Sequence, residues 1–241
     1  MLARILDDAV RDRLLASSPA RGVKLPKRPQ RRNVYLTAGQ LDRLATESGR
    51  YRSLVLLLGI GGLRWGEAAA LRVCDVDFLR HRVTLHRNAV DIGSGFVVGS
   101  LKNNKSRTVV LPPFVIDELA QTAEAKDRED LLWPSRTGSY LGPPSSADSW
   151  LAGAVRRCQK ADPEFPRITA HDLRHTAASL AISSGANPKV VQRMLGHASA
   201  AMTLDVYADL FDSDLDSVAE NVAKMWPGQP SPGDLSAHKG L

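Results

Sequence analysis

The stretch HDLRHTAASLAISSG, residues 171–185, joins a polar beginning to an apolar run that predicts a helix over 170–184. His171, Arg174 and His175 stand at its start, where a hydrophobic core has no use for titratable or cationic groups. His171 lies four residues before His175 and three before Arg174, so either pair shares one helical face. The histidines could ligate zinc, His171 and Arg174 could clamp an anion such as phosphate, and a merely solvated first turn is the third interpretation.

Length and composition favour a globular intracellular protein. The chain has 241 residues and two cysteines, Cys74 and Cys158, without CxxC spacing. Neither a disulfide framework nor a cysteine-based zinc site is indicated, and a reducing cytosol fits. The longest apolar run, SLVLLLGIGGL at 53–63, is too short to span a bilayer, and the amino terminus has no signal-peptide pattern. We therefore expect a cytoplasmic protein with no membrane partner.

The positive charge is concentrated near the amino terminus. Residues 1–33 hold nine Lys and Arg against three Asp, whereas the remaining residues carry 23 of each sign. The densest part is KLPKRPQRR, 24–32, where two prolines keep the backbone extended. A solvated basic tether is one interpretation. The other is a linker lying along a phosphate backbone, contacted by Lys24, Lys27, Arg28, Arg31 and Arg32.

Most of the chain reads as helix. Residues 2–16 space their apolar positions as one amphipathic helix, and Thr37 with Gln40 predicts a capping box at the start of the next. Gly59, Gly61 and Gly62 then place Arg64 at a bend between helices. Further helices are expected at about 51–59, 63–73, 113–125, 146–160, 170–184, 188–195 and 200–225, the last interrupted near 209–213.

Between 82 and 111 the pattern changes to short alternating segments. RVTLHR, FVVGSL and SRTVVL, separated by Gly, Asn and Ser, predict a small antiparallel sheet. Lys102 begins the turn KNNKS between the last two strands. The expected fold class is therefore α+β, mainly helical, with a small antiparallel β-sheet.

Four patches in this order resemble the tyrosine recombinase family, the phage-integrase type of site-specific DNA recombinase. They are GLRWGEAAALR, LKNNKSRTVVLP, HDLRHTAAS and MLGHASAAMTLDVYADL, and the resemblance spans about 30–225. It implies a catalytic domain of that family, in which Arg64 and Arg174 are the paired arginines and Tyr207 is the nucleophile. It further implies that Lys102 is the hairpin lysine, that His171 and His197 assist, and that Glu67 and His175 support the site.

The chemistry explains why the family needs this set. Attack on a phosphodiester builds negative charge on the non-bridging oxygens, which two guanidiniums can stabilise where other enzymes use a metal. The tyrosine oxygen takes the phosphate into a covalent 3′-phosphotyrosine link, and a lysine can protonate the leaving 5′ oxygen. No metal, cofactor or ATP is then required. Zinc at HDLRH is disfavoured because a dication would lie beside the fixed charge of Arg174.

The resemblance also sets expectations for domains and partners. Residues 1–23 look like the last helix of a core-binding domain, 24–33 a basic linker, 34–226 the catalytic domain and 227–241 a disordered tail. The expected partner is double-stranded DNA. The protein is expected to be a monomer in free solution and a homotetramer on DNA. It is expected to be encoded by a bacterium or a phage and to associate with the nucleoid. The alternatives are a truncated DNA-binding remnant without full recombination activity and a type IB topoisomerase-like nicking and resealing enzyme.

Overall fold

The computed structural model describes residues 2–23, 33–100, 106–197, 199–211 and 222–223. The chain separates into two compact units, Met1–Arg32 and Asn33–Leu241. In the first unit, α1 (Leu2–Arg11) has no buried residue. It ends before the predicted residue 16, because the chain turns away where Arg13 adopts a left-handed φ of 59°. Residues 24–32 of the predicted basic linker at 24–33, and the predicted tail at 227–241, lie outside the described residues.

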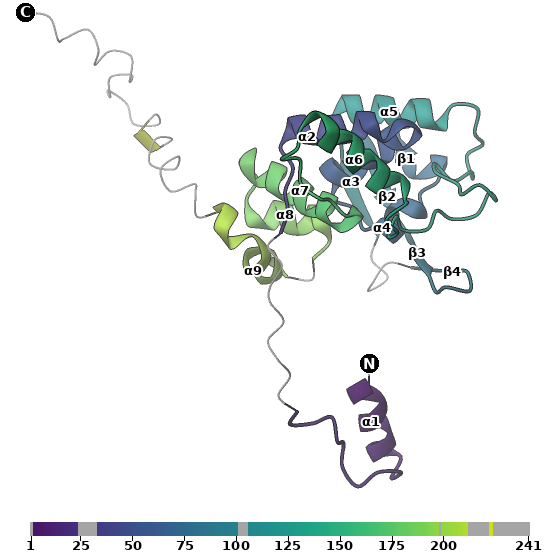
Figure 1. The fold of residues 1–241 in the computed structure, drawn as a ribbon, viewed down its shortest axis with the longest axis vertical. Helices are drawn as coiled ribbons and strands as arrows, with labels where there is room; N and C mark the ends of the chain where they lie inside the picture. The colour runs from purple at the N-terminus through teal and green to yellow at the C-terminus, as the bar shows by residue number, and fades with distance from the viewer. Residues whose placement is uncertain (1, 24–32, 101–105, 198, 212–221, 224–241) are drawn as a thin grey trace, which may run out of the picture. The chain divides into compact units, whose positions relative to one another are not determined.

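The second unit is built around one apolar helix. Helix α3 (Arg52–Gly61, RSLVLLLGIG) is apolar on all sides, and such a helix must be covered all round. It packs against α2 (Ala38–Glu47), α5 (Pro113–Ala123) and α7 (Ala170–Ser183), as Figure 1 shows, while α6 (Trp150–Ala161) packs on α2. Leu54, Val55, Leu57 and Leu58 on α3 are each at most 1% exposed. This core fixes the carboxyl end of α3, where Arg64 follows.

Side-chain caps start the helices at the predicted places. The Thr37 hydroxyl accepts from the backbone N–H of Gln40 at 3.2 Å, and the Gln40 side chain accepts from Thr37 N at 3.0 Å, so the capping box is confirmed. Helix α7 begins with a second capping box between Thr169 and Asp172. Asn187 caps α8 (Pro188–Leu195). These caps satisfy backbone donors that a helix start leaves unpaired.

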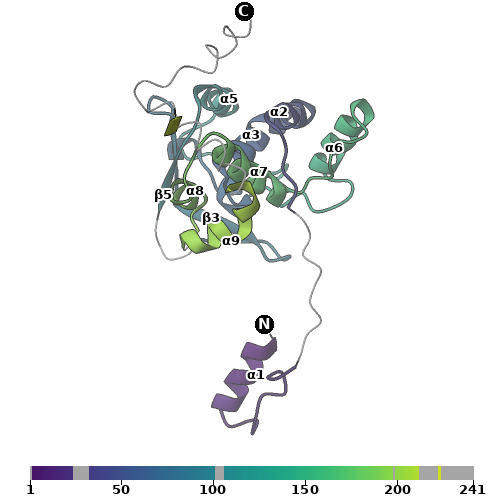
Figure 2. The same ribbon diagram turned by 90° about the vertical axis from the view of Figure 1, so that its left-hand side faces the viewer.

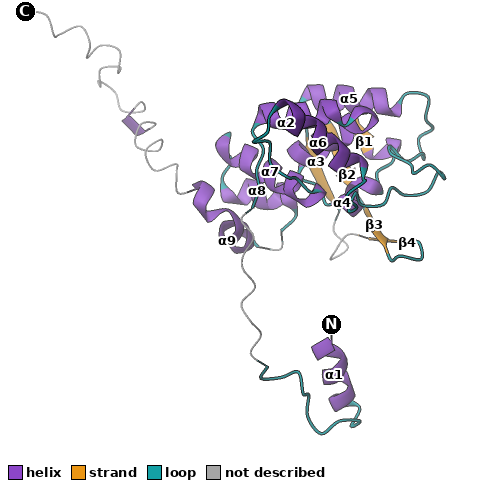
Figure 3. Ribbon diagram, in the orientation of Figure 1, coloured by secondary structure: helices purple, strands orange, loops and turns teal. Residues whose placement is uncertain are grey.

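The strands form two small antiparallel sheets. In the first, β2 (Arg82–Leu85) lies between β1 (Val76–Asp77) and β5 (Arg107–Val110), with Val83 opposite Val109. In the second, β3 (Arg87–Asp91) pairs with β4 (Phe96–Ser100) in a hairpin that extends from the body of the unit (Figure 3). RVTLHR was expected to be one strand, but it divides after Leu85 and contributes to both sheets. The turn with Lys102 falls within 101–105, outside the described residues.

Two backbone features shape the region beyond α3. Gly62 ends α3 with a left-handed φ of 68°, and a Cβ there would lie 2.6 Å from the side chain of Leu195, so α8 approaches this bend closely. Arg64 then forms the N-cap of α4 (Trp65–Ala69), which is shorter than the predicted 63–73. Helix α9 (Ala200–Phe211) lies beside α7 and α8 (Figure 2) and is kinked at Tyr207, with φ −126° and ψ 19°. The kink precedes the interruption expected near 209–213.

Candidate active site

A buried carboxylate holds the arginine at the bend between α3 and α4. Glu67 is 2% exposed; its Oε2 accepts from the backbone N–H of Arg64 at 2.8 Å and its Oε1 from Arg64 Nη1 at 2.9 Å. Arg64 Nη2 also donates to the carbonyl of Gly196 at 3.3 Å. Both terminal nitrogens of Arg64 are thus held, while 43% of its side chain remains exposed.

A second arginine joins the same carboxylate from the sheet. Arg107, the first residue of β5, donates from Nη1 to Glu67 Oε1 and from Nη2 to Glu67 Oε2, both at 2.7 Å. Its Nε donates to the carbonyl of Met194 near the end of α8 at 3.3 Å. Only 14% of the Arg107 side chain is exposed. The carboxylate of Glu67 therefore bridges two guanidiniums.

Arg174 lies on α7, next to the bend between α3 and α4. It is 3% exposed and donates from Nη1 to the carbonyl of Gly62 and from Nη2 to the carbonyl of Leu195, the latter at 2.7 Å. Each of these carbonyls belongs to the end of a helix, α3 or α8, where backbone acceptors lack intrahelical partners. The guanidinium is thus fixed between three helices, and no carboxylate within the described residues pairs with it.

The tyrosine on α9 meets α7 through a histidine. The hydroxyl of Tyr207 lies 2.9 Å from Nδ1 of His175, and Tyr207 as a whole is 2% exposed. The ring of His171 lies edge-on to that of His175, with centroids 4.7 Å apart. His197, just after α8, instead places Nδ1 3.0 Å from the hydroxyl of Thr203 on α9. His175 is therefore the histidine that contacts the tyrosine in this conformation.

The beginning of the second unit also touches α9. Asn33 Nδ2 donates to the carbonyl of Val206 at 3.4 Å, and the rings of Tyr35 and Tyr207 have centroids 6.5 Å apart. One residue further on, the backbone N–H of Leu36 donates to the hydroxyl of Thr176 on α7 at 3.1 Å. The positions of Val206 and Tyr207, at the kink, thus depend in part on where the chain enters this unit.

These contacts place the predicted residues in one cluster, which we call the arginine–histidine cluster: Arg64, Glu67, His171, Arg174, His175, His197 and Tyr207. The sequence that contains them matches a known family model, that of the phage integrase family, over residues 35–214. The chain belongs to the phage integrase family. Its model covers α2 to α9, so the whole cluster lies within the family domain.

Several integrases are similar to this chain. The putative prophage phiRv2 integrase of Mycobacterium tuberculosis (strain ATCC 25618 / H37Rv) is 30% identical over 216 residues, 85% of this chain and 55% of that protein. The integrase of Mycobacterium phage D29 is 30% identical over 214 residues, with the same coverage of both chains. This chain therefore spans about half the length of the curated integrases it matches.

Solved recombinases share its fold. An integrase of the Tn1549 transposon, in complex with transposon right-end DNA, has a TM-score of 0.73 at 19% identity and covers 90% of this chain and 76% of its own. The XerA recombinase has a TM-score of 0.59 at 26% identity, covering 80% and 66% respectively. The expected α+β, mainly helical class with small antiparallel sheets is confirmed.

Burial and mutual repulsion shift the cationic groups of this integrase site. Burial and then the charge of Arg64 lower the pKa of Arg174 to about 10, so the guanidinium stays charged at neutral pH. Burial followed by the charges of Arg174 and Arg64 lowers the pKa of His197 to about 4. The pKa values of His171 and His175 are also lowered, first by burial, so all three imidazoles are neutral near pH 7.

The two acidic groups shift in opposite directions. Burial opposes ionisation of Glu67, but the hydrogen bonds and charge of Arg107, helped by Arg64, outweigh it and lower the pKa of this carboxyl. Burial raises the pKa of Tyr207 to about 12, although the nearby charge of Arg174 acts in the other direction. In this conformation, Glu67 is ionised and Tyr207 keeps its proton.

Sequence reasoning missed Arg107, Thr203 and Tyr35. Arg107 stands in the patch LKNNKSRTVVLP, and a cation at the start of an otherwise apolar strand was the available signal. Thr203 looked like an ordinary helix residue, although it is fully buried. Tyr35 follows the basic linker, and no spacing connects it with a residue 172 positions later. Conversely, Lys102 and the linker cations Lys24, Lys27, Arg28, Arg31 and Arg32 lie outside the described residues.

The zinc interpretation finds no donor set in the described part of the chain. No group of three or more His, Cys, Asp and Glu side chains is placed there to hold a metal ion, whereas a zinc site uses three or four protein ligands. The nearest candidates, His171 and His175, are two, and Nδ1 of His175 contacts Tyr207. Across the same residues, no helix has both the length and the apolar character to cross a membrane.

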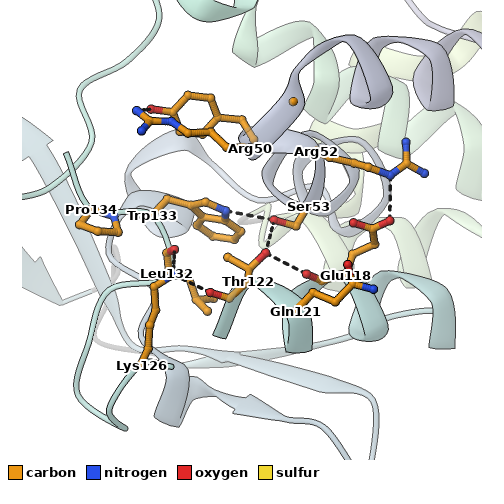
Figure 4. Close-up of a pocket in the computed structure, with 12 residues that line it drawn as sticks. Arg50, Arg52, Ser53, Glu118, Gln121, Thr122, Lys126, Leu132, Trp133 and Pro134 are labelled. Atoms are coloured by element: carbon orange, nitrogen blue, oxygen red, sulfur yellow. Dashed lines mark hydrogen bonds and ion pairs between the residues drawn. The ribbon is translucent and has the colours of Figure 1, made fainter. Parts of the chain in front are cut away.

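A cavity of about 530 Å³ lies at the other end of α3 (Figure 4). Thr122 and Trp133 both donate hydrogen bonds to the hydroxyl of Ser53, at 2.7 and 3.1 Å, and Lys126 donates to the carbonyl of Leu132 at 2.9 Å. The described members of the arginine–histidine cluster are not among its lining residues. Its polar groups bond one another, so we assign this cavity to the packing of α3 on α5.

Proposed function

We propose that this chain is the catalytic part of a site-specific recombinase that cuts and rejoins double-stranded DNA through a covalent 3′-phosphotyrosine intermediate. The observation that carries the proposal is the contact between the Tyr207 hydroxyl and His175 on the helix that also presents Arg174. The relatives named as integrases, and the Tn1549 integrase solved with DNA, support the same substrate.

The two arginines of the proposed mechanism divide the work of holding phosphate. Arg174 is immobilised by two carbonyls and contributes a fixed positive charge, with no carboxylate bonded to it among the described residues. Arg64 is anchored by Glu67, and 43% of its side chain is exposed. Together they bind the non-bridging oxygens and stabilise the charge that builds on them during attack.

The nucleophile in this proposal is Tyr207, and His175 accepts its proton. A neutral imidazole whose Nδ1 faces the hydroxyl can take the proton as the tyrosine oxygen bonds to phosphorus. The lowered pKa of His175 keeps the imidazole neutral at physiological pH. Because Tyr207 is 2% exposed, we further infer that α9 moves when DNA binds, and the kink at Tyr207 is the place where it can do so.

The remaining roles follow the order of the reaction. As the phosphorus–oxygen bond to the 5′ side breaks, Lys102 donates a proton to the leaving oxygen. His171 and His197 assist at the phosphate and, being neutral, add hydrogen bonds rather than charge. In rejoining, a 5′ hydroxyl attacks the phosphotyrosine, the proton returns to the tyrosine oxygen, and no ATP is consumed.

We also propose the domain roles that go with this chemistry. Residues 34–226 form the catalytic domain, 1–23 contribute the last helix of a core-binding domain, and Lys24, Lys27, Arg28, Arg31 and Arg32 contact DNA phosphates. The protein is a monomer in free solution, assembles as a homotetramer on DNA and associates with the nucleoid. The local excess of positive charge supports the DNA contact.

The test is covalent trapping. The chain is incubated with nicked suicide DNA carrying candidate sites, with and without EDTA, and the products are separated on a denaturing gel. We expect a protein–DNA adduct that survives EDTA and is missing with Tyr207→Phe. Binding without adduct formation would favour the DNA-binding remnant, and nicking and resealing without exchange would favour the topoisomerase-like alternative.

A further inference from the structure

Arg107 binds the carboxylate of Glu67, which also anchors Arg64. Its two terminal nitrogens each face one oxygen of Glu67 at 2.7 Å, and Arg64 Nη1 shares Oε1 at 2.9 Å. Such parallel, two-point pairing fixes the plane of a carboxylate more firmly than a single contact can. The orientation of Glu67, and with it the anchor of Arg64, is therefore set largely by a residue outside the predicted site.

Arg107 also reaches the backbone that precedes His197. Its Nε donates to the carbonyl of Met194, and a Cβ on Gly196 would lie 3.0 Å from the Arg107 guanidinium carbon. Arg64 donates to the carbonyl of this same Gly196. One side chain thus packs against both supports of Arg64, the carboxylate of Glu67 and the end of α8.

The charges give this arrangement a second effect. A lone Glu67 would form an ion pair with Arg64 and cancel much of its charge, because both groups are partly shielded from water. Here the guanidiniums of Arg64 and Arg107 share the carboxylate of Glu67, so these three groups together carry one net positive charge. This charge lies beside Arg174. Of the two guanidiniums, that of Arg64 is the more accessible to DNA, because 43% of the Arg64 side chain is exposed against 14% for Arg107.

We propose that Arg107 is a positioning residue of the cleavage reaction, which orients Arg64 through Glu67 and keeps the charge of Arg64 available to the scissile phosphate. This inference rests on the proposed function. Arg107 itself need not contact DNA. A purely structural role, in which Arg107 only stabilises the fold by pairing a buried carboxylate, makes different predictions.

The experiment compares two substrates. One is the suicide DNA with a normal scissile phosphate; the other carries a methylphosphonate there, in which a methyl group replaces one charged oxygen. With less charge to stabilise, the second substrate depends less on Arg64. We expect Arg107→Ala to slow adduct formation about 10²-fold on phosphate, the scale of one lost transition-state donor, but less than about 10-fold on methylphosphonate. DNA affinity should change by less than about threefold, because positioning acts on the reaction step.

Double variants and a matched control separate positioning from folding. In an Arg64→Ala background, adding Arg107→Ala should slow cleavage by less than about threefold, since residues acting through one another are not additive. Arg87→Ala is the control, because Arg87 also pairs with a buried carboxylate, that of Asp75, at 2.7 Å, in an ion pair outside the cluster. It should leave the ratio of the two substrate rates at the parent value.

Arg107→Lys keeps a positive charge but cannot span both oxygens, so it decides the matter if Arg107→Ala does not fold. On the phosphate substrate, Arg107→Lys should slow adduct formation less than Arg107→Ala does. On the methylphosphonate substrate the slowing should again be smaller than on phosphate. Equal slowing on both substrates by every Arg107 variant would overturn the proposal and leave a structural role. A parent chain that forms no adduct would overturn the proposed function, and this inference with it, whereas an active parent matched by Arg107→Ala would overturn this inference alone.

Discussion

The Tyr207 hydroxyl and Nδ1 of His175 are 2.9 Å apart, although 32 residues separate them in the chain. His175 is one residue from Arg174, so α7 presents a proton acceptor and a fixed cation from adjacent positions. The sequence resemblance gave His175 only a supporting role and assigned assistance to His171 and His197. The geometry of the resting site places His175 in direct contact with the hydroxyl of Tyr207, the proposed nucleophile.

The acid limb of the pH profile tests that partnership. Burial lowers the pKa of His175, so the imidazole stays neutral from high pH to somewhat below its ordinary value, about 6.5, and is protonated only at lower pH. We expect the parent rate of adduct formation to fall as pH drops through this lowered pKa, and His175→Gln to be slow and to lack this limb. An unchanged limb in His175→Gln would assign the titration to another group, for which His171→Gln and His197→Gln are the next variants.

Lys102→Ala tests the leaving-group proton. Loss of a general acid should slow cleavage by roughly 10²- to 10⁴-fold. A substrate with sulfur in place of the bridging 5′ oxygen needs no proton on leaving and should restore most of the rate. Lys105→Ala, in the same KNNKS turn, is the matched control and should remain close to the parent. Sulfur rescue of Arg64→Ala but not of Lys102→Ala would contradict the assignment.

The free energy of unfolding should decrease as the pH falls from about 6.5 to about 4. The pKa of His197 is about 4 in the folded chain and near the ordinary 6.5 when unfolded, so the unfolded state binds more protons between these values. The contribution of His197 to the free energy of unfolding is therefore fully present above about pH 6.5 and is lost as the pH falls toward 4. Urea midpoints at pH 7.5 and 5.0 should show this loss, and His197→Gln should reduce it. A midpoint that rises on acidification would refute the direction of the shift.

Salt dependence tests the linker contacts. Replacing Lys24, Lys27, Arg28, Arg31 and Arg32 with Gln should weaken DNA binding and flatten the plot of log affinity against log salt by about 0.9 per lost phosphate contact. Anisotropy titrations between low and physiological salt measure the slope. Gln at the exposed loop residues Arg128 and Arg136 is the control. A slope unchanged by the linker variant would leave those residues as a solvated tether.

Local signals predicted the helices well and the strands less well. The capping pair Thr37–Gln40 depends only on neighbouring residues, so the sequence specified it directly. The division of RVTLHR between two sheets depends on pairing with β5 and β4, which are brought up by the tertiary fold. The early end of the first helix, at the left-handed Arg13, likewise has no signature in its apolar spacing.

The predicted site residues show the same difference between local and long-range signals. The family resemblance identified Arg64, Arg174 and Tyr207, because each lies in one of the four sequence patches that carry it. The role of Arg107 arises from a carboxylate 40 residues away, and the contact of Tyr35 with Tyr207 from the path by which the chain enters the unit. Such relations are long-range, and no periodicity or spacing within one segment contains them.

The hydrogen bond from Asn33 to the carbonyl of Val206 has a mechanical consequence. Asn33 is the first residue of its compact unit, and the bond joins it to the residue immediately before Tyr207. Asn33 therefore contacts α9 next to the kink, at the point where the chain enters this unit. We expect a tag, fusion or surface attachment upstream of Asn33 to change the rate of adduct formation where it breaks this contact, so the length of any such attachment becomes an experimental variable.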